Sequence, residues 1–206
     1  MHFSTASIVL GLASLAAAQL PAVPIIQKIA TSATSCADTS PESECRTAEQ
    51  AAPFIAKSMS DYEIYTTPEM AAIVSLMAFE SVEFKYKHNV SPGRAGQGTA
   101  NMQMAQFNLA YAMSIPSLKD KVAQFSTVDG LADDALNQIL ALVQPDEYNF
   151  ASGAWYYKTY CDASVKDALD ANPDDGFAKY MACVGAAVTD DRLAYWNKAK
   201  EAFGIN

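Results

Sequence analysis

The sequence has little of what several classes of protein need. Only 14 of its 206 residues are Lys or Arg, against 23 Asp and Glu, and the formal net charge is -9. This acidic balance argues against a nucleic-acid partner, because nucleic-acid-binding proteins carry a basic surface. No apolar run reaches the ~20 residues that a bilayer-spanning helix requires, so we expect no membrane partner. Nine Gly and nine Pro are too few for a collagenous or linker-like chain.

The first residues are typical of a secretory signal peptide. Residues 1–18 contain an apolar stretch from Ile8 to Leu15, and Ala16-Ala17-Ala18 supplies the small side chains that cleavage needs. We therefore predict a secreted, extracellular protein whose cysteines lie in an oxidising compartment.

Histidine and cysteine are scarce as well. Two His, four Cys and no Cys-x2-Cys pair offer little for a zinc site, and we expect no metal and no cofactor. Four cysteines allow three disulfide connectivities. We favour Cys36–Cys45 with Cys161–Cys183, because each pair closes a short local loop that stabilises the fold.

The sequence does contain patterns that are typical of α-helices. Half of its residues are hydrophobic, which excludes a disordered chain, and the length suits one domain. Residues 19–43, rich in Ser, Thr, Pro and Ala, are expected to form an extended N-terminal arm, followed by one domain over residues 44–206. In that domain apolar residues recur at helical spacing without β–α alternation. The predicted helices begin near Thr47, Thr67, Asn101, Ser117, Leu131, Phe150, Ser164, Phe177 and Thr189.

One segment departs from the helical pattern. Between Lys85 and Thr99, three glycines and Pro92 mark turns between short polar stretches, which favours a small β-hairpin. The sequence therefore predicts a mostly α fold with a small β-hairpin insertion.

Glu80 closes an unusually apolar helix. From Met70 to Phe79 the sequence has no charge and a single hydroxyl, so this helix belongs in the middle of a core. At the C-terminal end of a helix the dipole disfavours a negative charge, and partial burial removes water from the carboxylate. A carboxyl group that keeps its proton in this way can act as a general acid.

The surroundings of Glu80 resemble a known family. Residues 79–103 contain Phe-Glu-Ser at a helix end, a Gly-rich hairpin, and Asn-Met-Gln opening the next helix. This order resembles the lysozyme-like superfamily, in which lytic transglycosylases and goose-type lysozymes have Glu-Ser, a variable loop and then Gly-Leu-Met-Gln. The likeness is closest to secreted fungal muramidases, with which Pro-Gly-Arg-x-Gly-Gln-Gly-Thr is associated. Asn101-Met102 departs from the superfamily pattern.

The resemblance implies a lysozyme-like catalytic domain, a glycoside hydrolase that acts as a monomer on bacterial peptidoglycan. Such a muramidase cleaves the β-1,4 bond between N-acetylmuramic acid and N-acetylglucosamine. Glu80 would protonate the glycosidic oxygen, Ser81 would orient nearby groups, and Gln103 would bind the sugar. Arg94 would contact a substrate carboxylate, and Tyr157 would hydrogen-bond near the acid.

The partner carboxylate and the outcome of the reaction stay open. No Asp or Glu occurs from Val90 through Lys119, so the hairpin cannot supply the second carboxylate that glycoside hydrolases use. Glu83, one turn after Glu80, could hold a water or face solvent. Without a partner, a lytic transglycosylase would use the muramyl 6-hydroxyl in place of water. A chitin or chitosan hydrolase and a non-catalytic secreted glycan-binding protein also stay open.

Overall fold

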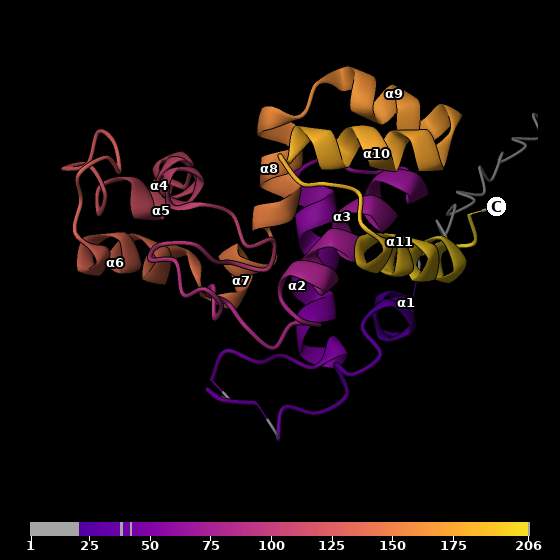
Figure 1. Ribbon diagram of the computed structural model, residues 1–206, viewed down its shortest axis with the longest axis horizontal. Helices are drawn as coiled ribbons and strands as arrows, with labels where there is room; N and C mark the ends of the chain where they lie inside the picture. Colours follow the sequence, from indigo (N-terminus) through magenta and orange to yellow (C-terminus); the bar gives the residue numbers. More distant parts are fainter. Residues whose placement is uncertain (1–20, 38, 42, 206) are drawn as a thin grey trace, which may run out of the picture.

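The computed structural model describes residues 21–37, 39–41 and 43–205, and the predicted signal peptide lies outside this part of the chain. The described chain is mostly helical, as predicted (Figure 1). Among these residues no helix has the length and apolar character that crossing a membrane requires. The helices are α1 (Ala22–Ile29), α2 (Ala48–Asp61), α3 (Thr67–Glu80), α4 (Ala105–Ser114), α5 (Pro116–Lys119), α6 (Asp133–Val143), α7 (Asp146–Asn149), α8 (Ser152–Tyr160), α9 (Ala163–Ala171), α10 (Pro173–Cys183) and α11 (Asp190–Phe203).

The apolar helix α3 runs through the centre of the main body, by which we mean α1, α2, α3, α9, α10 and α11 (Figure 1). Every residue from Ala71 to Ala78 is buried. A helix that is apolar all round must be covered all round, and α11 supplies the most extensive packing along it. Within this core, Trp196 stacks on Phe177 with ring centroids 4.7 Å apart.

A second core holds the side lobe, which comprises α4, α5 and α6 and lies apart from the main body in Figure 1. Leu109 of α4 packs there with Ile139 and Leu140 of α6. Helix α8 stands between the two cores and contributes to both. Its Trp155 and Tyr156 belong to the core of the side lobe, whereas its Ala154 and Tyr157 belong to that of the main body.

The predicted N-terminal arm is not extended throughout, since it contains α1. Ile25, Ile26 and Ile29 are buried on one face of this helix, which packs against α11 and α2. A helix of 8 residues is marginal by itself, so burial of its isoleucine face accounts for its presence. The favoured disulfides Cys36–Cys45 and Cys161–Cys183 are both formed.

The predicted hairpin is reduced to isolated pairings within the groove loop, our name for residues 85–104. His88 and Gly98 form an antiparallel bridge, and Gly98 forms a second one with Gln103. Because Gly98 pairs with a residue on either side, the backbone folds into a series of tight turns. No strand forms among the described residues. A Cβ atom on Gly98 would lie 2.3 Å from the carbonyl oxygen of Lys87, so only glycine fits this approach.

Candidate binding groove

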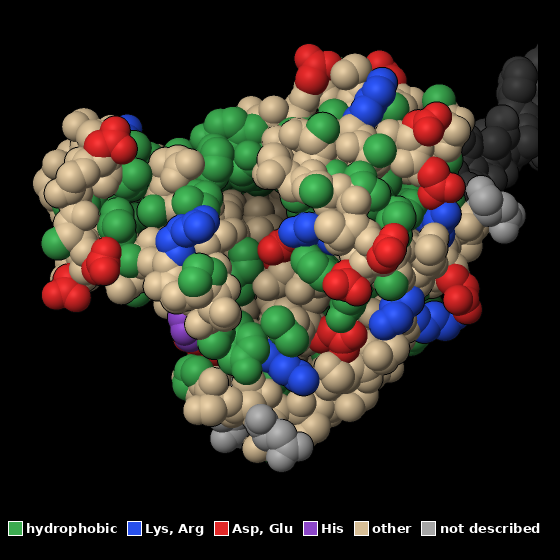
Figure 2. All heavy atoms as spheres, viewed as in Figure 1, with side chains coloured by type: hydrophobic (Ala, Val, Ile, Leu, Met, Phe, Trp, Pro, Cys, Tyr) green, Lys and Arg blue, Asp and Glu red, His purple; other side chains and the backbone are tan. Residues whose placement is uncertain are grey.

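An open groove lies between the main body and the side lobe. Its volume is about 380 Å³, and Figure 2 shows it as a hollow with basic side chains on both sides. Walls come from α3, the groove loop, α4, α8, the segment after α10, and α11. The lining residues are Leu76, Glu80, Arg94, Gln97, Asn101, Met102, Gln103, Met104, Phe107, Tyr156, Val184, Gly185, Ala186, Ala187 and Arg192.

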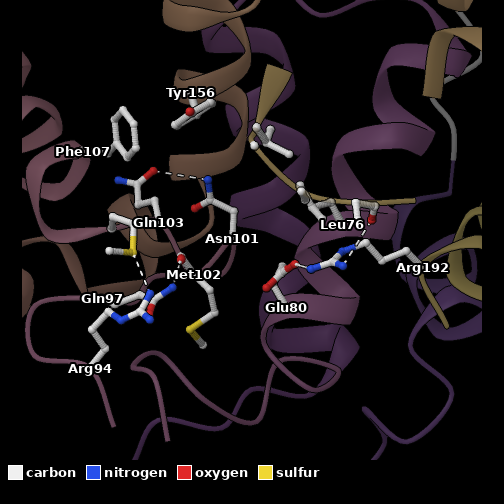
Figure 3. A pocket seen from close by; sticks show the side chains of 15 residues that line it. Leu76, Glu80, Arg94, Gln97, Asn101, Met102, Gln103, Phe107, Tyr156 and Arg192 are labelled. Atoms are coloured by element: carbon white, nitrogen blue, oxygen red, sulfur yellow. Dashed lines mark hydrogen bonds and ion pairs between the residues drawn. The ribbon is translucent and has the colours of Figure 1, made fainter. Parts of the chain in front are cut away.

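One wall carries an ion pair between Glu80, the last residue of α3, and Arg192 of α11 (Figure 3). Nη2 of Arg192 donates to Oε1 of Glu80 at 2.8 Å, and the two side chains are 19% and 20% exposed. The guanidinium also lies over the ring of Phe79, 4.6 Å from its centroid. Glu80 therefore faces the groove, but its charge is offset by a neighbour that the prediction did not include.

The opposite wall is a network of amides that fixes the groove loop (Figure 3). Nδ2 of Asn101 donates to Oε1 of Gln103 at 3.2 Å, and Nε2 of Gln103 donates to Oδ1 of Asn108 at 2.8 Å. Asn108 is fully buried and donates to the carbonyl of Gly96 at 2.8 Å, while Oγ of Ser152 donates to Oδ1 of Asn101 at 2.7 Å. The donors that face the groove are thus held in place by α4 and α8.

Aromatic rings line the end of the groove beside the side lobe. Phe107 of α4 lies 4.9 Å from Tyr156 and 5.2 Å from Tyr160, both of α8, measured between ring centroids. Tyr156 and Tyr160 are 4.9 Å apart. Burial raises the pKa of Tyr156, and the nearby Tyr160 adds to this, so the Tyr156 hydroxyl stays neutral. Because Tyr160 is 44% exposed, these three rings, which we call the aromatic ridge, continue from the groove to the surface.

The structure brings three of the predicted site residues together and separates the others. Glu80, Arg94 and Gln103 line the groove, whereas Ser81 and Tyr157 do not. The Ser81 hydroxyl is buried and donates to the carbonyl of Met77 at 2.6 Å. The Tyr157 hydroxyl lies in the main body, where it donates to the buried Glu69 at 3.1 Å.

Glu83 also points away from the groove. Residues 82–84 have positive φ, 57° at Glu83 itself, so the helical spacing from Glu80 no longer applies. The Glu83 carboxylate accepts hydrogen bonds from the backbone N–H of Ser32 and from the hydroxyl of Tyr195, and Nζ of Lys198 lies 3.9 Å away. Burial alone would raise the pKa of Glu83, but these hydrogen bonds and the Lys198 charge outweigh it and lower the pKa.

The sequence analysis did not name the aromatic ridge or Asn101 as part of the site, and it also missed Asn108 and Arg192. Asn108 carried a signal, since it is a single amide within the apolar segment from Phe107 to Met113 that forms most of a buried helix. Arg192 carried none, because it is 112 residues from Glu80 in the chain and looks like any basic residue in the first turns of a helix.

The cysteines and His88, which could ligate a metal, are engaged in other contacts. In the described part of the chain, no group of three or more His, Cys, Asp or Glu is placed to hold a metal ion. All four cysteines are in disulfides, and Nδ1 of His88 lies 2.7 Å from Oε2 of Glu44. Among the groove's lining residues, Glu80 is the one carboxylate.

A comparison with curated proteins finds a relative outside the predicted family. The chain is 49% identical over 157 residues to a bifunctional dioxygenase (DOX)-epoxy alcohol synthase (EAS) of Fusarium oxysporum (strain Fo5176). The match covers 76% of this chain but 12% of that protein, so the chain corresponds to a small part of its relative. No family model and no solved structure matches.

This relative overturns the identity that residues 79–103 suggested. The predictions of a lysozyme-like protein, a glycoside hydrolase and a muramidase that degrades the cell wall were wrong, because the related protein is a dioxygenase and epoxy alcohol synthase. The lytic transglycosylase and the chitin or chitosan hydrolase rested on the same resemblance and fall with it. The motif misled because it consists of a helix end and a glycine-rich turn, which are local features that unrelated folds share.

Secretion, a monomeric state and the absence of nucleic-acid and membrane partners stay predictions. The two disulfides are compatible with secretion without demonstrating it.

Proposed function

We propose that this chain is a ligand-binding domain whose groove holds an oxygenated, amphipathic molecule of the epoxy alcohol class. The observation that carries the proposal is the union of fixed polar groups and an aromatic ridge around one open groove. Ligand sites commonly combine apolar walls with a few well-placed polar groups.

The polar groups suit the two oxygens of an epoxy alcohol. An epoxide oxygen only accepts hydrogen bonds, and the amide of Asn101 uses one of its two N–H donors on Gln103. A hydroxyl group also donates, and Oε2 of Glu80 is the carboxylate oxygen that Arg192 leaves unbound. The amide donors therefore face the Glu80 acceptor across the groove. The aromatic ridge lies next to both, where it would contact the carbon skeleton of the ligand.

The relative supports the same ligand class. Its description names an epoxy alcohol synthase, and the chain matches a small part of that protein. A binding role for this part agrees with a groove built of amides, guanidinium groups and rings. This chain would then bind an epoxy alcohol, the class of molecule that the related protein forms.

Isothermal titration of the full chain with an epoxy alcohol tests the proposal. We expect saturable binding that Phe107→Ala weakens about tenfold, since loss of part of a ring contact costs ~1.4 kcal/mol. Tyr65→Ala is the matched control, because Tyr65 is 69% exposed and lies outside the groove. The predicted partner, a peptidoglycan oligosaccharide, is titrated in parallel. Binding of the oligosaccharide alone, or equal affinity for the Phe107→Ala variant, would overturn the proposal.

A further inference from the structure

Arg94 differs from the two other arginines of the chain in what its guanidinium contacts. Arg46 bonds Asp146 at 2.6 Å, and Arg192 bonds Glu80 at 2.8 Å. Within the described residues, the side chain of Arg94 makes one hydrogen bond, from Nη1 to Sδ of Met104 at 3.5 Å. A thioether sulfur is a weak acceptor, so the positive charge of Arg94 has no acidic partner there.

The backbone around Arg94 is nevertheless held in place. Oδ1 of Asn89 accepts from the N–H of Gly93 at 2.9 Å, and Nδ2 of Asn89 donates to Oε1 of Gln97 at 2.8 Å. The turn at Gly93 and Arg94 is therefore tied to the opposite branch of the groove loop. Figure 3 shows Arg94 across the groove from Glu80 and Arg192, so its exposed side chain extends from a well-held stretch of backbone at the rim.

Among the described residues the groove offers this cation no free acidic partner, and an acid group on the ligand would supply one. Glu80 is the groove's one carboxylate and is already paired with Arg192. A guanidinium carries N–H donors in a planar fork that matches the two oxygens of a carboxylate. A phosphate, with its larger charge, would call for a second free cation, and Arg192 is engaged. The arrangement thus favours a ligand with a single carboxylate.

We propose that Arg94 binds the carboxylate end of the groove's ligand while the aromatic ridge covers its hydrocarbon part. This inference rests on the proposed function and narrows it to epoxy alcohols that carry an acid group. It also sets the direction of the ligand. The acid group would lie at the groove loop, and the hydrocarbon part would run along Phe107 and Tyr156 toward the exposed Tyr160.

The test compares one epoxy alcohol as its free acid and as its methyl ester, each titrated into the full chain and into Arg94→Gln. We expect the wild-type protein to bind the acid about tenfold more tightly than the ester, which is the effect of one charge-assisted pair. Arg94→Gln should bind both equally, at the affinity of the ester. Lys121→Gln makes the same change in net charge at an exposed position outside the groove, and we expect it to keep the preference for the acid.

The outcomes separate this inference from the proposed function. If neither acid nor ester binds, the proposed function fails, and the inference with it. If both bind the wild-type protein equally, the groove is an epoxy alcohol site and the role of Arg94 is refuted. A preference for the acid that survives in Arg94→Gln also refutes it, as does tighter binding of the matching phosphate monoester.

Discussion

Glu83 allows a sharp test of how the fold is held, because this nearly buried carboxylate joins three segments. It is 6% exposed and accepts hydrogen bonds from Ser32 and Tyr195 beside Lys198. Glu83→Gln keeps the shape and one acceptor oxygen but removes the charge. Hydrogen bonds to charged groups contribute ~1.5–3 kcal/mol and neutral ones ~0.5–1.5 kcal/mol. With two bonds weakened, we expect the free energy of unfolding at pH 7 to fall by about 2 kcal/mol.

The difference in the free energy of unfolding between the wild-type protein and Glu83→Gln should depend on pH. The pKa of Glu83 is lowered in the fold, so the ionised carboxylate stabilises the protein above the pKa of roughly 4.3 that a glutamate has in an unfolded chain. This stability is lost as the pH falls through the folded-state pKa. Because glutamine does not titrate, the gap between wild type and variant should narrow below about pH 4.3.

Urea unfolding at pH 7 and at several values down to pH 3 measures both effects, and thermal unfolding should show a midpoint lower by about 4–8 °C at pH 7. Glu63→Gln is the control, since Glu63 is exposed and its φ of 52° resembles the 57° of Glu83. We expect the control to change stability by less than about 0.5 kcal/mol. Equal stability of Glu83→Gln and wild type at pH 7, or a gap that stays constant to pH 3, would refute the reasoning.

Two further substitutions probe the groove loop and its anchor. Asp146 receives Nζ of Lys87 at 2.5 Å and Nε of Arg46 at 2.6 Å, so Asp146→Asn leaves the Lys87 charge, 7% exposed, without its partner. We expect a loss of about 3 kcal/mol in urea unfolding, and a loss below 1 kcal/mol would contradict this role. Gly98→Ala should push residue 98 away from the Lys87 carbonyl and so distort the groove loop, at a cost of about 1–3 kcal/mol. It should also weaken ligand binding in titration calorimetry, and unchanged affinity would show that the loop does not shape the groove.

Features that depend on neighbours in the sequence were predicted well. The helix predicted to begin near Thr47 is α2, whose start is capped by Thr47 and Gln50, and the helix predicted near Thr189 is α11, whose start is capped by Thr189. The apolar stretch before Glu80 is the central buried helix. Each of these follows from contacts within a few residues, which a single sequence displays.

Features that depend on distant partners were not predicted. α1 exists because other helices bury its isoleucines, and the direction of Glu83 follows from Ser32 and Tyr195, far away in the chain. Glu80, Arg94 and Gln103 line one groove because they are close together in the chain, whereas the ion pair with Arg192 had no local signal. The function was misassigned for the same reason, since a short local motif does not define a whole protein.

Helix α8 contributes to the width of the groove from inside the protein, away from the rim. Its 9 residues contribute side chains to both interiors, so the position of α8 contributes to the separation of the groove's two sides. Exchange of exposed residues along the rim should leave these buried contacts of α8 unchanged. Conversely, neither half of the protein can be excised or transplanted intact, because each would lose one side of its own interior.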